Sequence, residues 1–482
     1  MDQIVHQIPR PRNPGFSGEI KPVALALGLV FGLGVGIAPA ASAATITVNN
    51  LSGTSVGGQC TLRDALLAAD SNAVVQGCAA GSGADTINFS VTGTISLATE
   101  LTIDSDVTIN GPGAANLKLA PSSTNRAIYI KNNHTTAISG VTFQGNGSAI
   151  VNGAALYHYS GTLTIQNSVF SGNVTTGKGG AIYNYGGNVV IRSSTFSGNI
   201  AAGLGGAIYN YAGNISIDAS TFSGNQSAAG GGAIAFYADT GTPRSLLTIT
   251  NSTLSGNQTT GVNKLGGAIY LHNVAASTIT NSTISGNSSS GKGGAIALYR
   301  TILAVNNSTI TGNTATSSVG GVYLYGSTLN LFSTIVANNV GGGSTDIGIG
   351  ETGTVNGTNS LVRSTSGFSF STNVNNITGL DPLLGPLASN GGPTQTMALL
   401  PGSPAIDKGI NPLALAFDQR GTPFVRSSGV TDIGAYEVQG APPPPPVANV
   451  PVPTLSQWSL ALLSAMMAGW AMLTGFGKRR RR

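Results

Sequence analysis

Charged side chains are scarce in this chain, because only 8% of its 482 residues are Asp, Glu, Lys or Arg. Typical globular domains carry about 25%. Hydrophobic residues make up 41%, which is enough for a sizeable core, so the shortage of charge does not indicate a disordered polar chain. Gly, Ser, Thr and Asn replace the missing charge, and such a surface is not that of an ordinary soluble enzyme.

The formal net charge of +5 belongs to the two ends of the chain. Residues 1–43 carry a net charge of +1, and the last five residues, 478–482, add +5. The body between them therefore has a net charge of −1. A neutral body offers no basic surface for a phosphate backbone, so we expect no nucleic-acid partner.

The N-terminus has the features of an export signal. An apolar run over residues 22–37 is followed by Ala-Ser-Ala at 41–43, with small residues at the two positions that a signal peptidase recognises. We therefore expect residues 1–43 to be a secretory signal peptide that is cleaved after Ala43 or Ala44. A retained membrane anchor is the alternative.

The C-terminus combines a short motif, an apolar stretch and a basic end. The motif is Val452-Pro453-Thr454-Leu455, and the uncharged residues 459–476 follow it. Eighteen such residues just reach across a hydrocarbon layer, and the final arginines orient them with the basic end in the cytoplasm. The three parts together resemble the bacterial IPTL-type sorting signal, with Val452 where that family usually has Ile.

The IPTL resemblance implies a membrane-embedded sorting protease of the exosortase type as a partner, and an apolar helix that anchors the chain at least transiently. A plain membrane anchor at the tail is the alternative.

Cysteine is nearly absent. Cys60 and Cys78 are the only two, with 17 residues between them. Two thiols cannot build a structural zinc site, and in an exported chain such a pair most simply forms a disulfide. Closing a loop of this length contributes roughly 3 kcal/mol, mainly by restricting the unfolded chain.

Two phrases recur along the chain with a period near 26 residues. Copies of Ser-x-Phe-Ser-Gly-Asn end at Asn173, Asn199, Asn225, Asn257, Asn287 and Asn313, with looser copies that end at Asn146 and Asn338. Copies of Gly-Gly-Ala-Ile begin at Gly179, Gly205, Gly231, Gly266 and Gly293. Short β-type runs without helical periodicity predict one coil of a parallel β-solenoid per repeat.

Stacked coils bring equivalent residues to within about 4.8 Å of each other, so each repeat position becomes a ladder. The large apolar position of the first phrase predicts an inward ladder: Phe170, Phe196, Phe222, Leu254, Ile284, Ile310 and Ile335. We expect the closing Asn of each copy to bond through its amide to the Asn above and below. A calcium-binding β-roll is excluded because it requires a regularly spaced Asp.

The alternation of Gly-Gly-Ala-Ile with Phe-x-x-Asn resembles the repeats of polymorphic outer-membrane proteins, and the body resembles a pectin-lyase-like solenoid. The expected fold class is therefore all-β, a right-handed parallel β-helix. Residues 59–66 resemble the CSLREA domain of bacterial surface proteins, and parts of 379–437 resemble the choice-of-anchor Q domain. These families imply display on a bacterial cell surface and supply no reaction.

The expected organisation has six parts, of which the first is the signal peptide and the last contains a C-terminal transmembrane helix. They are residues 1–43 (signal peptide), 44–106 (CSLREA-like cap), 107–345 (β-helix), 346–438 (choice-of-anchor Q-like C-terminal cap), 439–451 (Pro-rich linker) and 452–482 (sorting signal). We expect a short amphipathic helix over 61–70 to cover the N-terminal end of the solenoid, because an open strand edge invites aggregation.

Catalytic groups are sparse in the predicted solenoid. Glycoside hydrolysis needs two carboxylates that face one bond, and the body offers only Asp218 and Asp239, at unmatched repeat positions. The titratable histidines of the body are His134, His158 and His272. His158 occupies the slot of Asn184 and Asn210, which favours a turn or ladder role. We expect no enzyme and no cofactor, with a polysaccharide lyase or hydrolase of the β-helix class as the alternative.

Acids concentrate instead in the C-terminal segment. They are Asp381, Asp407, Asp418, Asp432 and Glu437. A calcium or hydrolytic site is conceivable there, but turn roles and salt bridges with Arg420 and Arg426 are the simpler interpretation. We therefore predict no metal.

A row of tyrosines is the one candidate binding feature. Alignment of the Gly-Gly-Ala-Ile phrases places Tyr159, Tyr185, Tyr211, Tyr237, His272 and Tyr299 at one position, and Tyr157, Tyr183, Tyr209 and Tyr270 two residues earlier. If Ile182 points inward, alternation along the strand turns these tyrosines outward. We hypothesise a flat aromatic strip that stacks on sugar rings or on a partner protein. The interpretation that we favour over this hypothesis is that the rings stack on one another and shield the backbone.

The sequence as a whole predicts an exported, surface-displayed β-helix protein with a structural or adhesive role. Its predicted partners are a polysaccharide or a surface protein.

Overall fold

The structure is a computed structural model, and it describes residues 43–145, 152–238, 245–343, 346–439 and 462–470. Residues 1–42, Asp239 and the predicted sorting motif Pro453-Thr454-Leu455 lie outside these ranges.

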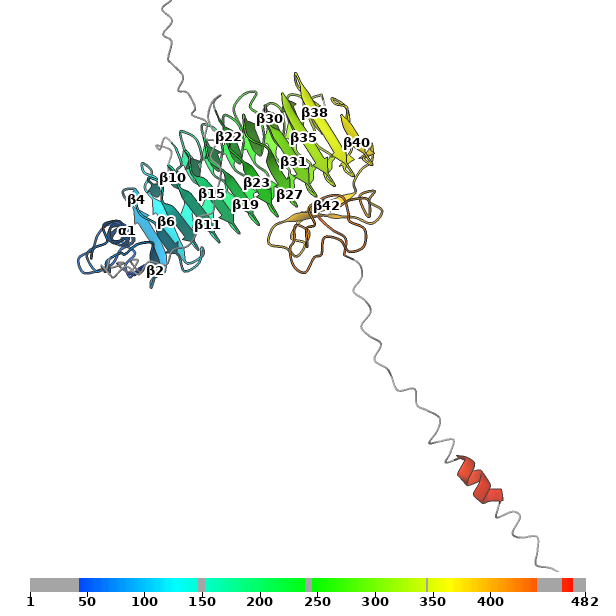
Figure 1. Ribbon diagram of the computed structural model, residues 1–482, viewed down its shortest axis with the longest axis horizontal. Coiled ribbons are helices and arrows are strands. Elements are labelled where there is room, and N and C mark those ends of the chain that lie inside the picture. Colours follow the sequence, from blue (N-terminus) through cyan, green and yellow to red (C-terminus); the bar gives the residue numbers. More distant parts are fainter. Residues whose placement is uncertain (1–42, 146–151, 239–244, 344–345, 440–461, 471–482) are drawn as a thin grey trace, which may run out of the picture. The chain divides into compact units, whose positions relative to one another are not determined.

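Residues 45–378 form a parallel β-solenoid with three long sheets and one short sheet (Figure 1). The first sheet contains β1 (Thr45–Val48), β2 (Asp85–Phe89), β5 (Val107–Asn110), β8 (Thr135–Ser139), β11 (Thr162–Gln166), β15 (Asn188–Arg192), β19 (Ile215–Asp218), β23 (Leu247–Thr250), β27 (Ser277–Thr280), β31 (Ile302–Asn306), β35 (Ser327–Phe332), β38 (Gly353–Thr358) and β40 (Thr372–Val374). The second sheet contains β3 (Gly93–Leu97), β6 (Leu117–Pro121), β9 (Thr142–Gln144), β12 (Val169–Ser171), β16 (Thr195–Ser197), β20 (Thr221–Ser223), β24 (Thr253–Ser255), β28 (Thr283–Ser285), β32 (Thr309–Thr311), β36 (Ile335–Ala337), β39 (Leu361–Val362) and β41 (Ile377–Thr378).

The third sheet contains β4 (Leu101–Ile103), β7 (Ile128–Ile130), β10 (Leu156–His158), β14 (Ile182–Asn184), β18 (Ile208–Asn210), β22 (Ile234–Tyr237), β26 (Ile269–His272), β30 (Ile296–Tyr299), β34 (Val322–Tyr325) and β37 (Ile347–Ile349). The fourth, short sheet contains β13 (Val174–Thr175), β17 (Ile200–Ala201), β21 (Gln226–Ser227), β25 (Gln258–Thr259), β29 (Ser288–Ser289) and β33 (Thr314–Ala315). The predicted all-β solenoid fold is confirmed.

Inward ladders hold the coils together. Phe143, Phe170, Phe196 and Phe222 are fully buried, and successive rings stack with centroids 4.6 Å apart. Leu254 and later aliphatic residues continue the ladder. The last predicted member is off by one residue, because Val336, not Ile335, pairs with Ile310. Ile335 instead lies on the outer side of the second sheet, where it packs against the C-terminal segment.

A buried asparagine ladder runs beside the phenylalanines. Its side chains donate from Nδ2 to Oδ1 of the next coil over 2.8–2.9 Å, in the order Asn173, Asn199, Asn225, Asn257, Asn287, Asn313, Asn339 and finally Asp346. Asn339 is the member of this ladder where the sequence indicated Asn338. Asn338 has φ +59° and takes the place of Gly312, whose φ is +65°.

The two glycines of each Gly-Gly pair are required for two different steric reasons. The first glycine is in the left-handed region, with φ +66° at Gly179. The second has no room for a side chain, because a β-carbon at Gly180 would lie 2.0 Å from the carbonyl oxygen of Gly206 in the next coil. The bend therefore requires glycine at both positions.

The solenoid extends beyond the predicted range of 107–345. It begins with β1 and continues through β41, so that the coils at both ends belong to the same sheets as the central ones. These end coils keep the inward apolar alternation, as at Ile46 and Val48, but lack the two phrases. A search for the phrases therefore finds only the middle of the solenoid.

The N-terminal coil is covered by α1 (Leu62–Ser71), the predicted helix, which packs against β1, β2 and β4. Thr61 caps it, since its hydroxyl accepts from the backbone N–H of Asp64. The predicted disulfide between Cys60 and Cys78 is present and closes the loop that contains the helix.

The C-terminal segment lies along the side of the solenoid, whereas the sequence indicated a cap over its end. β42 (Leu384–Ala388) and β43 (Thr396–Leu399) form an antiparallel pair, and the loops up to residue 439 pack on the second sheet. The Gln419 amide bonds to the hydroxyls of Thr253 and Thr283 over 2.9 and 2.6 Å. In the part of the chain that the structure describes, the residues of β40 in the last coil stay exposed.

The predicted membrane helix at 459–476 is only partly within the described ranges. Residues 462–470 are helical. None of the helices that the structure describes combines the length and the apolar character needed to cross a bilayer.

Candidate functional site

The outer face of the third sheet carries two rows of aromatic residues. We call the row that ends the strands the tyrosine strip: Tyr159, Tyr185, Tyr211, Tyr237, His272, Tyr299 and Tyr325. We call the row two residues earlier the buried row: Tyr129, Tyr157, Tyr183, Tyr209, Tyr270 and Tyr323. Strand pairing keeps both rows in register, as in Tyr183 with Tyr209 and His272 with Tyr299.

The buried row forms a small second core outside the solenoid. Tyr183 and Tyr209 are 8% and 0% exposed, and Leu204, Leu265 and Val319 pack against the same cluster. The Lys178 ammonium lies 4.6 Å from the centre of the Tyr209 ring. Burial raises the pKa of Tyr183. Two residues of the predicted binding set, Tyr183 and Tyr209, are therefore not at the surface.

Two members of the tyrosine strip are exposed, Tyr159 at 43% and Tyr185 at 39%, and the other five are half-buried. Its rings stack on one another along the solenoid. Ring centroids are 5.1 Å apart for Tyr159 and Tyr185, 5.3 Å for Tyr185 and Tyr211, 4.4 Å for Tyr237 and His272, and 4.7 Å for Tyr299 and Tyr325. Stacked rings cover each other's faces, so the strip presents ring edges and hydroxyls to a ligand.

The rings therefore stack on one another, as the sequence favoured, and the strip does not offer the flat aromatic surface of the binding hypothesis. A sugar ring that stacks on a tyrosine needs a free ring face, and the neighbouring coil occupies it. Hydrogen bonds to hydroxyls of the strip remain as a contact, although His272 has no hydroxyl and the hydroxyls of Tyr299 and Tyr325 bond to Tyr323 and Glu351.

Of the two predicted acids of the body, the structure describes Asp218. Asp218 Oδ1 accepts from the Thr250 hydroxyl over 2.7 Å and from Asn251 Nδ2 over 2.8 Å, at the end of β19. Asp239 lies outside the described ranges.

The three histidines have separate surroundings. His158 is fully buried and its Nδ1 lies 2.8 Å from Asn184 Oδ1, in the ladder slot that the sequence indicated. Burial lowers the pKa of His158. His134 lies between two carboxylates, with Nε2 3.3 Å from Asp104 and Nδ1 3.6 Å from Asp106. His272 is part of the tyrosine strip.

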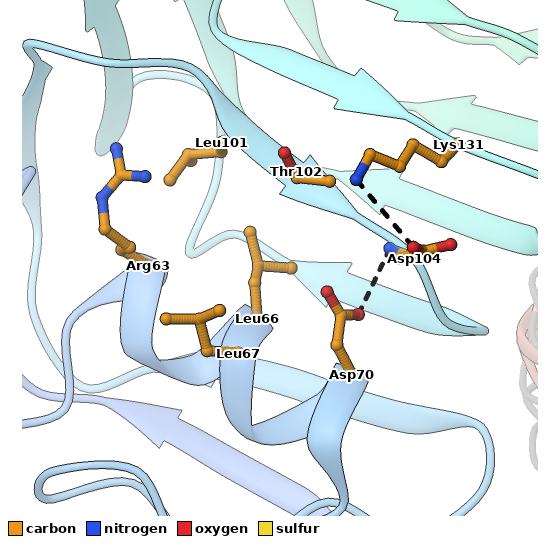
Figure 2. Close-up of a pocket in the computed structure, with 8 residues that line it drawn as sticks. All are labelled: Arg63, Leu66, Leu67, Asp70, Leu101, Thr102, Asp104 and Lys131. Carbon is orange, nitrogen blue, oxygen red and sulfur yellow. Dashed lines mark hydrogen bonds and ion pairs between the residues drawn. The ribbon is translucent and has the colours of Figure 1, made fainter.

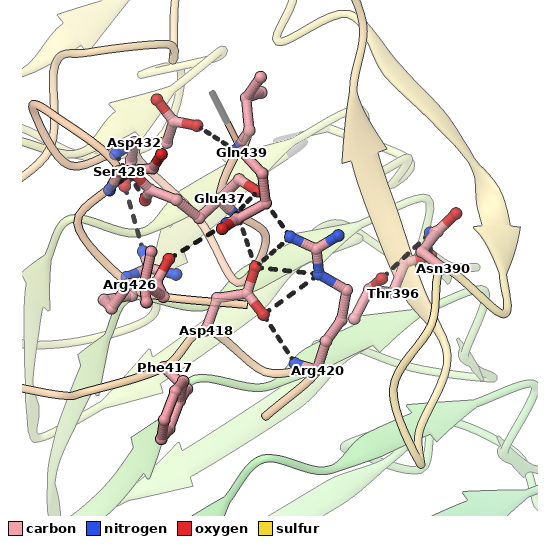
Figure 3. A network of polar contacts seen from close by, with 12 residues as sticks. Asn390, Thr396, Phe417, Asp418, Arg420, Arg426, Ser428, Asp432, Glu437 and Gln439 are labelled. Atoms are coloured by element: carbon pink, nitrogen blue, oxygen red, sulfur yellow. Dashed lines mark hydrogen bonds and ion pairs between the residues drawn. The ribbon is translucent and has the colours of Figure 1, made fainter. Parts of the chain in front are cut away.

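The C-terminal acids hold loops in place (Figure 3). Asp418 and Arg420 form a buried salt bridge of 2.6 Å, and the guanidinium lies 3.8 Å from the ring centres of both Phe424 and Tyr436. Asp418 also accepts from the backbone N–H of Glu437. These are the salt-bridge and turn roles that the sequence favoured.

A second set of contacts surrounds Arg426, which is fully buried. Its guanidinium donates to the carbonyl oxygens of Asp432 and Gly434. The Glu437 carboxylate accepts from the backbone N–H of Ser428 and Asp432, and burial raises its pKa to about 7. Within the described ranges, no three His, Cys, Asp or Glu side chains are grouped to hold a metal ion.

Sequence reasoning missed a cavity of about 420 Å³ beside α1 (Figure 2). Its lining residues are Arg63, Leu66, Leu67, Asp70, Leu101, Thr102, Asp104 and Lys131. They come from the helix and from β4, β7 and the turns after them. Arg63 and Leu66 belong to the CSLREA-like stretch 59–66, but that resemblance implies no cavity, and the two repeat phrases have not yet begun at this point of the chain.

Two family models match this sequence. Residues 126–308 match a right-handed β-helix region, which agrees with the predicted handedness of the solenoid. Residues 450–482 match the IPTL-CTERM motif and contain the predicted Pro453, Thr454 and Leu455. A comparison with proteins of curated function finds no match. The chain is thus a β-helix repeat protein with a C-terminal sorting motif of exported, surface-sorted proteins.

Proposed function

We propose that this protein is an adhesive or structural component of a bacterial cell surface, and that the tyrosine strip is its contact surface. Export by the signal peptide, sorting by an exosortase-type protease and transient anchoring through the apolar tail belong to this proposal. The CSLREA-like and choice-of-anchor Q-like segments support it, since both resemblances point to surface display.

One observation carries the proposal. Tyr159 and Tyr185, at 43% and 39% exposure, belong to a row of aromatic residues that repeats along the outer face of the solenoid. The hydroxyls of Tyr159, Tyr185, Tyr211 and Tyr237 follow one another at one per coil. Such a row matches a ligand that is itself a polar repeat, and a polysaccharide has this property. A surface protein is the other partner that the strip would fit.

The test replaces Tyr185, Tyr211 and Tyr237 together, once with Phe and once with Ser. Purified protein is incubated with bacterial and plant polysaccharides, and both retention on the polymer and release of shortened or unsaturated products are measured. The Phe variant keeps the stacked rings and loses only the hydroxyls. We expect it to lose retention at least tenfold, and the Ser variant to lose at least as much.

Other outcomes discriminate the alternatives. Full retention by the Phe variant with loss by the Ser variant would assign binding to the rings. Full retention by both would remove the strip as the contact surface. Release of products would show a polysaccharide-active enzyme in place of an adhesive protein.

A further inference from the structure

The cavity beside α1 lies at the N-terminal end of the tyrosine strip. Ile103 pairs with Ile130, and Ile130 pairs with His158, so the residues that follow them occupy successive rungs of one column. These residues are Asp104, Lys131 and Tyr159. The first two line the cavity, and the third is the first ring of the strip.

The neighbouring column leads to the same place. Thr102, which lines the cavity, pairs with Tyr129, and Tyr129 pairs with Tyr157 of the buried row. If each aromatic row continued by one more coil towards the N-terminus, its next residue would stand at Lys131 in the tyrosine strip and at Thr102 in the buried row. Both of these residues line the cavity. There α1, which covers the end of the solenoid, packs beside β4, and the pocket lies between the helix and the first two coils of the third sheet.

The pocket combines an apolar wall with polar groups at its ends. Figure 2 shows Leu66, Leu67 and Leu101 between Arg63 on one side and Asp70 with Asp104 on the other. The volume of about 420 Å³ is within the common range of small-molecule sites, and the lining is more polar than usual, which suits a ligand rich in hydroxyl groups.

The polar groups are held in position by the protein. Arg63 donates to the carbonyl oxygens of Gly53, Thr99 and Glu100. Asp70 Oδ1 accepts from the Ser105 hydroxyl over 2.6 Å. Lys131 Nζ lies 4.0 Å from Asp104 Oδ2.

We propose that this pocket is a terminal subsite of the tyrosine strip, which binds one unit of an uncharged sugar chain. The inference rests on the proposed function and specifies its ligand. A chain that lies along the strip reaches the pocket directly, because the column of residues is continuous from Tyr159 to Lys131 and Asp104.

The charge of the pocket selects an uncharged ligand. Two cations, Arg63 and Lys131, face two carboxylates, Asp70 and Asp104, so the site has no net charge to attract an acidic or a basic polymer. Carboxylates accept hydrogen bonds from hydroxyl groups, and an ammonium donates to them. The leucines fit the C–H face of a sugar ring, and the polar groups fit its hydroxyl rim.

The experiment measures binding of neutral gluco-, manno- and galacto-oligosaccharides of two to four units to the purified full-length protein by calorimetry. The corresponding neutral polymers and a polyuronate are compared in a retention assay. Leu67→Arg places a longer side chain in the pocket. Val74→Arg is the matched control, because it makes the same change of charge at a site that is 71% exposed and outside the pocket.

We expect Leu67→Arg to weaken oligosaccharide binding at least tenfold while Val74→Arg leaves it unchanged. The Phe variant of the strip should keep oligosaccharide binding and lose the polymer. Thermal unfolding of each variant verifies that it is folded.

Failure of this inference is separable from failure of the proposed function. Unchanged oligosaccharide binding by a folded Leu67→Arg variant would remove the pocket, and polymer retention that depends on the strip would still stand. Preference for the polyuronate would overturn the uncharged class. Absence of binding to every sugar would overturn the pocket and the polysaccharide as the ligand of the strip together.

Discussion

The asparagine ladder makes a quantitative prediction at Asn225, which is fully buried. Its Oδ1 accepts from the backbone N–H of Asn199 over 3.0 Å and from Asn199 Nδ2 over 2.8 Å. The substitution Asn225→Ala removes this acceptor and leaves the backbone N–H of Asn199 and one of its two Nδ2 hydrogens without a partner, while the other Nδ2 hydrogen stays on the Phe170 carbonyl oxygen. A buried donor without a partner costs about 1–3 kcal/mol, so we expect a loss of about 2–6 kcal/mol in the free energy of unfolding.

Urea unfolding followed by far-ultraviolet circular dichroism measures this loss, because the two tryptophans, Trp458 and Trp470, lie in the C-terminal tail and do not report on the solenoid. Asn110→Ala is the control, since Asn110 is exposed on the first sheet, and it should cost less than about 1 kcal/mol. A cost below 1 kcal/mol for Asn225→Ala as well would refute the reasoning that the ladder stabilises the solenoid.

Two further predictions concern protonation and the docking of the C-terminal segment. Burial lowers the pKa of His158 below 6.5, so the unfolded chain binds the proton first and stability falls as the pH drops from about 6.5. Burial raises the pKa of Glu437 from 4.5 to about 7, so stability falls as the pH rises from 4.5 to about 7. The midpoint of thermal unfolding is measured from pH 5 to 8. Its decline towards low pH should disappear in His158→Asn, and its decline towards high pH should disappear in Glu437→Gln. Parallel profiles for both variants and the wild type would contradict these directions. Gln419→Ala removes the amide that bonds to Thr253 and Thr283, and hydrogen exchange should accelerate at least tenfold in 384–439, whereas the exposed control Gln144→Ala should change nothing. Unchanged exchange in Gln419→Ala would show that the segment is held by its apolar contacts alone.

The side chains that point into the solenoid were predictable because equivalent residues of successive coils pack on one another as a ladder. The inner members of the phenylalanine and asparagine ladders have the same residue above and below them, so one position of the repeat reveals the chemistry of the whole column. The error at Ile335 and Asn338 has a simple cause. An asparagine can adopt the left-handed conformation of the glycine that it replaces, so two adjacent asparagines, Asn338 and Asn339, both fit the closing position by sequence.

The side-on position of the C-terminal segment was not predictable from the repeats. Thr253 and Thr283 look like Thr195 and Thr221 in sequence, and pairing places all four at equivalent positions of the second sheet. Only the first two are buried, because Gln419 lies against them. Contacts over more than 130 residues of sequence leave no periodic signal.

The same limit applies to the candidate site, and it explains where recognition would be found on such a fold. Alternation correctly turned the tyrosines outward, but it could not show that Tyr183 and Tyr209 are covered or that the rings of the strip occupy each other's faces. Periodic stacking covers the ring faces that would distinguish one coil from the next, and it leaves a row of ring edges and hydroxyls that His272 interrupts. Selectivity then has to come from a place where the repetition stops. The repetition stops at Asp104 and Lys131, which lie in the same column as the tyrosine strip, just before its first ring and beside α1.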